Sequence, residues 1–308
     1  MEAGTVTEYT LTCNKSIEQN YLYIWGYIDV ATGKAIIPAQ YESAGAFKDG
    51  AAQVSLSRQT KLIENPLAKG KANIGGVAGF SADVDANIPV ANTKNAETFA
   101  FIFANENYPN YNVSFANNDG KIFKEYCAKT LGVPEKNIRF YENATSGNMV
   151  SAINKLKEIA DVYDGDAKFI IYYSGQGATD DNDKISYLLP VDAVLTHLTS
   201  TGYSVEKLNK ELSQISTKSV LLILDACFSA ATGDETAHQY EEKGHGLFTY
   251  FLLKKLQETN GNVTYGELSD YVTKQVKRQS VVINNKRQTP TVIPSPILGE
   301  KWLNMKLK

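Results

Sequence analysis

The sequence is poor in several residue types whose abundance would point to a particular class of protein. Its 308 residues contain three cysteines, three histidines and no basic excess, since 31 Lys and Arg residues stand against 34 Asp and Glu residues. Cys13, Cys127 and Cys227 are too few for a disulfide framework and lack the CxxC spacing of a structural zinc site. A net charge of −3 without a basic cluster gives no sign of binding to nucleic acid or to an anionic membrane.

Long apolar runs are also missing. Clean apolar runs such as residues 220–224 fall far short of the roughly 18–20 residues of a membrane span. The first residues, Met1 to Gly4, show no basic region followed by an apolar one, so we expect no signal peptide in this form and leave the compartment open. With 43% hydrophobic and 21% charged residues, the chain has the balance of a folded globular protein.

Composition divides the chain into three parts. Residues 1–56 are rich in strand-forming aromatic residues and predict a small β-rich unit. Residues 57–92 predict a linker or irregular crossing, because the stretch 69–76 is rich in Gly and small residues and has neither a helical nor a strand period. Residues 93–308 have the regular pattern of one larger domain.

In this larger domain, predicted strands and helices alternate. We expect apolar strands at 99–104, 137–141, 169–173 and 220–224, the last of them fully buried, and helices at 114–131, after the N-cap candidate Thr145, at 204–215, at 247–256 and after Thr264. Continuous apolar strands that alternate with helices predict an α/β fold, with a parallel sheet covered on both faces. Ligands of such sheets lie at the carboxyl ends of the strands.

Two of these strands end in unusual sequences. The first end, residues 172–177, reads YYSGQG, and the second, residues 224–229, reads LDACFS. A cysteine just past a buried strand and beside an acid is a candidate nucleophile, which singles out Cys227. Cys127, on the inward face of a predicted helix, is expected to be a buried small hydrophobic residue instead.

Together the two strand ends resemble the caspase-like cysteine peptidases, especially the metacaspase and paracaspase branch. In that family one strand ends in Tyr-Ser-Gly-His-Gly, whose His is the base, and the next ends in Asp-Ala-Cys-Phe-Ser or similar, whose Cys is the nucleophile. The resemblance extends from about Phe99 to Tyr250 and includes residues 105–108 and 244–250. It implies a three-layer sandwich in which a mostly parallel sheet of about six strands lies between helices.

Gln176 stands where the family has its catalytic His. A glutamine amide does not accept and return a proton near neutral pH, and we do not expect another histidine to replace the base. The resemblance therefore implies a cysteine endopeptidase that is inactive or strongly impaired. A natural loss of the base and an inactivating substitution both fit. The alternative function is that of a natural pseudo-protease acting as a peptide-binding or protein-binding module.

The resemblance also implies a substrate preference. Metacaspase-like members cleave after Arg or Lys and use acids in the S1 pocket; Asp225 and Asp119 match two such acids, and Ser174 matches a pocket-lining serine. A carboxylate at the base of a pocket pairs well with a guanidinium or ammonium group. The expected partner is thus a peptide or protein substrate with a basic P1 residue. Each acid also has a structural interpretation. Asp119 fits a first-turn acid that the helix macrodipole favours, and Asp225 fits a hydrogen-bond acceptor beneath the loop.

Two further segments depart from a plain caspase-like domain. The stretch from Gly26 to Gly50 resembles one WG repeat, a small β-hairpin unit that usually occurs in arrays; a short β extension without its own role is the alternative. Residues 231–237 follow Ser229 at once, where the family usually inserts a loop and another strand that help to build the substrate cleft.

No metal ion or cofactor is required by this reading. Asp180 to Asp183 could offer oxygen ligands to calcium, as in some metacaspases, but the spacing lacks the EF-hand glycine and terminal Glu, so a solvated acidic loop is favoured. A phosphate-binding turn at 174–177 is disfavoured, because neither GxxxxGK[ST] nor GxGxxG is present. We expect Gln176 and Cys227 to face one cleft from neighbouring strand ends; the oligomeric state is not specified by the sequence.

Overall fold

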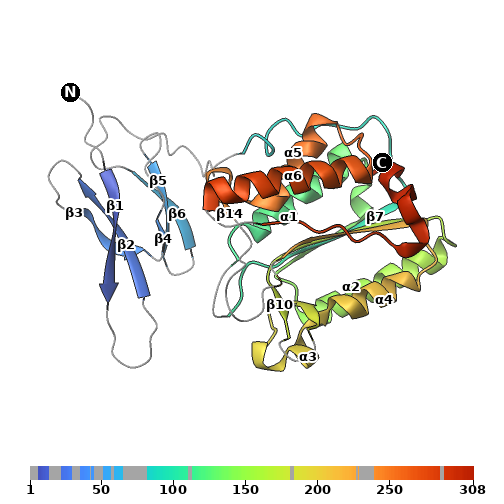
Figure 1. Cartoon of the computed structure of the whole chain (residues 1–308), viewed down its shortest axis with the longest axis horizontal. Coiled ribbons are helices and arrows are strands. Elements are labelled where there is room, and N and C mark those ends of the chain that lie inside the picture. Colours follow the sequence, from blue (N-terminus) through green and yellow to red (C-terminus); the bar gives the residue numbers. More distant parts are fainter. Residues whose placement is uncertain are drawn as a thin grey trace. The chain divides into compact units, whose positions relative to one another are not determined.

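The chain divides into two compact units, Met1–Gly79 and Phe80–Lys308. Their structure, a computed structural model (Figure 1), describes residues 6–13, 22–29, 35–41, 43–44, 51–56, 59–64, 82–109, 113–180, 184–226, 228, 239–284 and 288–308.

The first unit contains two antiparallel sheets. One joins β1 (Val6–Cys13), β2 (Leu22–Asp29) and β3 (Ala35–Tyr41), and the other joins β4 (Ser43–Ala44), β5 (Ala51–Leu56) and β6 (Gln59–Glu64). The pairing of β2 with β3 agrees with the hairpin expected of the WG-like stretch. β6 lies within the range expected to be an irregular crossing, but all six of its residues pair with β5, because this segment carries strand-forming Thr, Leu and Ile.

The second unit is built on a parallel sheet, as predicted. Its strands follow the order β13-β9-β7-β8, with bounds Ser219–Asp225, Lys168–Ser174, Thr98–Ala104 and Ile138–Glu142. The described residues thus place four strands in this sheet, against the expected six or so. Shorter strands form separate antiparallel pairings: β10 (Gly177–Thr179), β11 (Ser186–Leu188) and β12 (Tyr203–Ser204), and β14 (Gln239–Tyr240) with β15 (His245–Gly246).

Helices cover both faces of the sheet, which gives the three layers seen in Figure 1. One face is covered by α1 (Ala116–Glu125), α5 (Leu247–Glu258) and α6 (Tyr265–Asn284), and the other by α2 (Ser146–Val162) and α4 (Val205–Ser213). The shorter helical segments are η1 (Tyr126–Thr130, a π-helix that continues α1), η2 (Glu135–Asn137), η3 (Leu195–His197), α3 (Leu198–Thr201), η4 (Glu241–Lys243) and η5 (Pro296–Asn304).

The period of two along each strand decides which side chains face which helical layer. One set of buried strand residues faces the layer of α1 and α5: Ala100, Ile102, Ile170, Tyr172 and Ile223. On the α2 and α4 side lies the alternate set, Phe99, Phe101, Phe103, Phe169, Ile171 and Tyr173. The prediction that 220–224 is fully buried is wrong: β13 stands at one end of the strand order among the described residues, and five of its seven residues are only half-buried.

The sequence signals that predicted where helices begin and end are confirmed. Thr145 caps α2 in a capping box with Asn148, and Thr264 and Glu267 exchange the same pair of hydrogen bonds at the start of α6. Gly132 ends the helical stretch with a φ of 68°, and a side chain there would meet the carbonyl oxygen of Thr93 at 2.2 Å. Cys127 is fully buried, and burial raises the pKa of its thiol, which confirms the prediction of an inert core residue.

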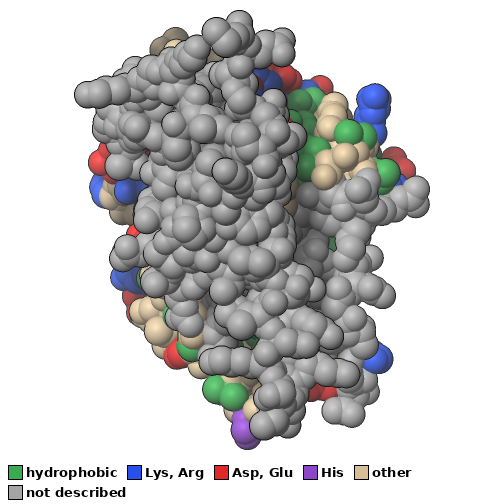
Figure 2. All heavy atoms as spheres, turned by 90° about the vertical axis from the view of Figure 1, so that its left-hand side faces the viewer, with side chains coloured by type: hydrophobic (Ala, Val, Ile, Leu, Met, Phe, Trp, Pro, Cys, Tyr) green, Lys and Arg blue, Asp and Glu red, His purple; other side chains and the backbone are tan. Residues whose placement is uncertain are grey.

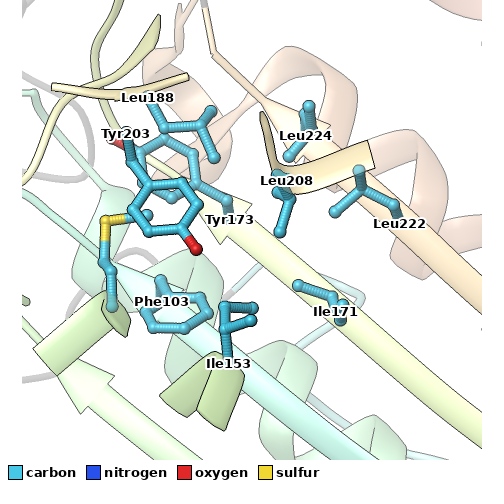
Figure 3. Close-up of a pocket in the computed structure, with 10 residues that line it drawn as sticks. Phe103, Ile153, Ile171, Tyr173, Leu188, Tyr203, Leu208, Leu222 and Leu224 are labelled. Carbon is cyan, nitrogen blue, oxygen red and sulfur yellow. The ribbon is translucent and has the colours of Figure 1, made fainter. Parts of the chain in front are cut away.

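A small apolar cavity lies between the sheet and the α2–α4 layer (Figure 3). It encloses about 10 Å³, room for roughly one water, and is lined by Phe103, Met149, Ile153, Ile171, Tyr173, Leu188, Tyr203, Leu208, Leu222 and Leu224. Its lining side chains point at one another and offer almost no polar group, so it is a gap in the core packing and not a substrate site.

In Figure 2 the described residues are visible around the edge of the face, and basic and acidic side chains both occur there. Within the described ranges, no helix is both long enough and apolar enough to cross a bilayer.

Candidate active site

Two of the expected pocket residues end neighbouring strands. Ser174 is the last residue of β9 and Asp225 the last of β13, and they stand opposite each other in the parallel register. The amide of Gly175 donates to the carbonyl oxygen of Asp225 at 3.2 Å, which continues the pairing past the strand end. Both side chains are buried, with 3% and 6% exposure. The prediction that the strands ending at Tyr173 and Leu224 are neighbours is therefore confirmed.

Asp119 reaches the same place from α1. Its carboxylate is 1% exposed and accepts a hydrogen bond from the amide of Gly246, with 3.0 Å between that nitrogen and Oδ2. A Cβ added to Gly246 would lie 2.8 Å from Oδ2 of Asp225 and 3.0 Å from Oδ2 of Asp119. The two carboxylates thus flank one glycine, and any side chain at that position would collide with both.

Asp225 is anchored by a chain of hydroxyl groups from α5 and β9. The hydroxyl of Thr249 donates to Oδ2 of Asp225 at 2.6 Å, and the hydroxyl of Tyr172 lies 2.6 Å from Oγ1 of Thr249. Because the single proton of Thr249 goes to the carboxylate, Tyr172 is the donor in the second bond. Burial raises the pKa of Asp225, and the Thr249 hydrogen bond opposes that rise.

His245 lies between two carboxylates and is fully buried. Its Nδ1 is 2.6 Å from Oδ1 of Asp119 and its Nε2 is 2.8 Å from Oδ1 of Asp85. Burial alone would lower the pKa of His245, but the hydrogen bonds and charges of Asp119 and Asp85 outweigh it and raise that pKa to about 9. The imidazole is therefore an imidazolium that donates from both nitrogens near neutral pH.

Asp119 experiences opposing influences. Burial raises the pKa of its carboxyl to about 7, while the hydrogen bond and charge of His245 act in the opposite direction. Nearby Asp225 adds to the rise, because two carboxylates near each other repel. The ionised form of Asp119 consequently depends on the donors around it, above all His245.

This arrangement predicts a loss of stability at alkaline pH. Folded His245 keeps its proton up to about pH 9, whereas an unfolded histidine releases it near 6.5. Since the folded state then binds more protons, the free energy of unfolding should fall by roughly 2–3 kcal/mol between those pH values. Asp119, whose pKa is also raised, changes stability in the same direction at lower pH. Urea unfolding followed by circular dichroism would measure the decline, and an equally steep decline in His245→Gln would contradict it.

The segment around Gln176 has a fixed backbone and a half-buried side chain. The backbone N–H of Gln176 donates to the hydroxyl of Tyr108 at 2.9 Å, and the backbone carbonyl oxygen of Gln176 accepts from the hydroxyl of Tyr173 at 2.7 Å. Both tyrosine hydroxyls also lie within hydrogen-bond distance of the carbonyl oxygen of Leu189, at 2.9 and 2.8 Å. Two buried tyrosines thus hold the position at which the family carries its base.

Gly175 and Asn105 explain the local sequence here. A Cβ on Gly175 would lie 2.9 Å from Cβ of Asn105 and 2.9 Å from the hydroxyl of Tyr173, so a side chain is excluded. Asn105 is fully buried; its side-chain oxygen accepts from the amide of Ala144 at 2.7 Å and its amide group donates to the carbonyl oxygen of Leu189 at 3.1 Å. Asn105 therefore ties the end of β7 to the segments around Ala144 and Leu189, and its Cβ lies against Gly175.

Cys227 itself lies outside the described residues, as does the segment 229–238. On one side of it, Asp225 pairs with Ser174, and on the other, the hydroxyl of Thr179 donates to the carbonyl oxygen of Phe228 at 2.8 Å. Both ties join the chain around Cys227 to the segment that carries Gln176. The expectation that Gln176 and Cys227 face one cleft stays a prediction.

The remaining candidates are an exposed histidine and residues that the structure does not describe. His197 is exposed at the end of η3, and His238 lies outside the described residues. Residues 181–183, which belong to the acidic stretch with possible calcium ligands, also lie outside the described residues. In the described ranges, no group of three or more His, Cys, Asp and Glu side chains has the arrangement of a metal site.

Sequence reasoning misses several residues of this site. The sequence pattern places Asp85 in a linker, and the family resemblance gives His245 no part as the base. Tyr108 and Thr249 belong to stretches that carry the resemblance, but the motifs by themselves assign them no role. One sequence signal could have indicated Tyr108 and Thr249: their stretches stand at a strand end and a helix start, beside the two strand-end motifs.

Comparison with known proteins agrees with this architecture. Residues 97–242 match the family model of the caspase domain, and residues 25–57 match that of the WG containing repeat. The solved caspase-1 from Spodoptera frugiperda is similar, with 16% sequence identity, a TM-score of 0.45 and coverage of 67% of this chain and 92% of that chain. No curated protein matches the chain. The chain therefore contains a caspase-like peptidase domain and, N-terminal to it, a WG repeat.

Proposed function

We propose that this domain is a cysteine endopeptidase of the metacaspase-like type, built to bind peptides with Arg or Lys at P1 and strongly impaired in cleaving them. Cys227 is the nucleophile and Gln176 occupies the position of the base. Asp225, Asp119 and Ser174 form the P1 pocket. The observation that carries this proposal is the pair of buried carboxylates on either side of Gly246, one on α1 and the other at the carboxyl end of β13.

The acid pair supports a basic P1 residue through its charge. Two carboxylates close to each other attract a guanidinium or ammonium group and repel an acidic side chain. Gly246 lies between Asp119 and Asp225, and the lack of a side chain at this position lets both carboxylates approach its backbone. Ser174, opposite Asp225 in the sheet, adds a hydroxyl to this group.

The impairment follows from the chemistry of Gln176. A cysteine without a histidine partner has a pKa of about 8.5, so only a few per cent is thiolate at pH 7. Lack of a general acid for the leaving amine slows the reaction by a further factor of roughly 10²–10⁴. Neither remaining described histidine is assigned this function: His245 donates to two carboxylates, and His197 is exposed at the end of η3.

A second candidate function is a natural pseudo-protease that binds peptide or protein without cleaving it. The observation that favours it is the hydrogen-bonded frame of Gln176, whose amide and carbonyl are both engaged by buried tyrosines. The backbone at this position is thus held by hydrogen bonds although the base is absent. This function predicts the same P1 preference and differs in the absence of any turnover.

Fluorescently labelled peptides that differ only at P1 test the proposal on the unmodified chain. We expect Arg and Lys peptides to bind about tenfold to a hundredfold more tightly than Leu or Asp peptides, the effect of a well-oriented charged hydrogen bond. Turnover of the same peptides should be very slow and should disappear in Cys227→Ala. Equal affinity across the P1 series would show that the acids are structural, and rapid turnover would contradict the impaired dyad.

A further inference from the structure

The imidazole of His245 joins the candidate P1 pocket to a segment that precedes the family match. Residues 82–86, here called the 82–86 segment, come before the caspase match, which begins at residue 97. From this segment Asp85 accepts from His245, which in turn donates to Asp119. His245 also lies outside the match, which ends at residue 242. Two of the three residues of the relay Asp85–His245–Asp119 thus lie outside the matched residues 97–242.

The 82–86 segment is held firmly against η1 and α5. Ala82 and Val84 are buried in the core on the α1 and α5 side. The carbonyl oxygen of Val84 accepts from the hydroxyl of Tyr126 at 2.8 Å, and the side chain of Gln257 donates to the carbonyl oxygens of Asp83 and Ala86 at 2.8 and 2.9 Å. Asp85 therefore approaches His245 from a rigid support.

Asp83 is bonded in a different way from its neighbour Asp85. Its carboxylate accepts from the ammonium of Lys254 at 2.8 Å and from the hydroxyl of Tyr250 at 2.9 Å, both on α5. The carboxylate of Asp85 instead accepts from the imidazole of His245. The segment thus offers two acids, of which Asp85 belongs to the relay.

The relay gives Asp119 a fixed orientation. His245 donates to Oδ1 and the Gly246 amide donates to Oδ2, so two consecutive residues hold both oxygens. Gly246 is also the N-cap of α5, and the positive end of a helix favours a nearby carboxylate. All three influences favour the ionised form that burial would otherwise suppress.

Asp85 offsets the positive charge of the imidazolium of His245. A protonated His245 by itself would cancel the charge of Asp119 and weaken the attraction for a basic ligand. Asp85 restores that negative charge on the far side of the ring while it accepts from Nε2. With Asp225 included, the cluster holds three carboxylates against one imidazolium, and a net negative charge remains for the ligand.

We propose that His245 and Asp85 are positioning residues for substrate recognition, which act through Asp119 by holding its carboxylate ionised and oriented toward a basic P1 side chain. This inference rests on the proposed function, because it assigns a partner pair to the same pocket. Neither residue touches the ligand. The relay sets the pH range in which basic peptides bind, and the 82–86 segment thereby becomes part of the specificity site.

The titratable groups around His245 are Asp119 on α1, Asp225 on β13 and Asp85 on the 82–86 segment, and next to these carboxylates lie the phenols of Tyr172 on β9 and Tyr126 on η1. The pKa of Tyr172 is raised by burial and by the two pocket carboxylates, so this phenol stays neutral. The pH response expected near neutrality therefore comes from the carboxylates and the imidazole.

The experiment measures the affinity of labelled Arg-P1 and Leu-P1 peptides for the full chain between pH 6 and 9. Three variants are compared with the unmodified chain: His245→Gln, Asp85→Asn and the matched control Asp83→Asn. In His245→Gln the imidazolium is gone, so the pKa of Asp119 should rise and the midpoint of Arg-peptide binding should move up by about one pH unit, a tenfold loss on the acid side. Asp85→Asn should shift it in the same direction by less, and Asp83→Asn should leave it unchanged.

The outcomes separate this inference from the proposed function. If the unmodified chain binds Arg and Leu peptides equally, the basic pocket itself is wrong. If it prefers Arg but both relay variants keep the Arg-to-Leu ratio and the pH midpoint, with only a lower melting temperature, the relay is structural and the inference fails. If Asp83→Asn shifts the midpoint as much as Asp85→Asn, the effect comes from the charge of the segment and not from the relay, which also overturns it.

Discussion

Replacing Gln176 by histidine should raise the rate of cleavage of Arg- and Lys-terminated fluorogenic peptides by on the order of 10²–10⁴. The imidazole would draw the proton from the Cys227 thiol and return it to the leaving amine, two tasks that an amide group does not perform. Because this substitution supplies a missing chemical group, whereas the others remove one, its effect should be the largest.

The surroundings of Gln176 are suited to this substitution. Its amide and carbonyl oxygen are held by Tyr108 and Tyr173, and these bonds involve only its backbone, so they persist when the side chain changes. The side chain is half-buried, which leaves room for an imidazole of similar length. Beyond it, Thr179 fixes the chain that follows Cys227 through the carbonyl oxygen of Phe228.

Two controls make the result decisive. Gln176→Asn keeps an amide at the site and should stay as slow as the original chain. The double variant with Gln176→His and Cys227→Ala should lose all the gained activity. If Gln176→His folds normally and binds Arg peptides but cleaves no faster, then the missing base is not the reason for slow turnover, and the binding-module function becomes the better account.

Replacing Asp225 by asparagine should reduce the affinity for Arg-P1 peptides by about tenfold to a hundredfold and leave Leu-P1 peptides within about twofold. Asparagine has the same shape, and its side-chain oxygen can still accept the proton of Thr249, so the anchoring chain from α5 is kept. What disappears is one of the two negative charges on either side of Gly246.

The measurement is fluorescence anisotropy with the same two labelled peptides. Asp164→Asn is a matched control, because Asp164 is an exposed acid in the turn after α2 with a φ of 49°, a conformation that asparagine tolerates. It should bind both peptides as the original chain does. Equal losses for Arg and Leu peptides in Asp225→Asn would assign Asp225 to structural support beneath the loop.

The sequence alone was sufficient for the parallel sheet, its two helical layers and the strand ends that carry Ser174 and Asp225. These features depend on short-range patterns: apolar runs such as 99–104, the capping box at Thr264 and the helix stop at Gly132. Such patterns act within a few residues, so they are visible without a structure. The extent of burial was less well predicted, because the place of β13 at one end of the strand order is not a local property.

Only the tertiary structure decided how the site is supported. Asp119 and His245 are separated by 126 residues, and His245 and Asp85 by 160, so no local pattern links them. The same holds for Tyr108, which fastens Gln176 from 68 residues away. Buried polar groups must find hydrogen-bond partners, and which partners they find depends on how α1, α5 and the 82–86 segment pack together. A sequence specifies the groups that need partners; the packing of distant elements selects the partners.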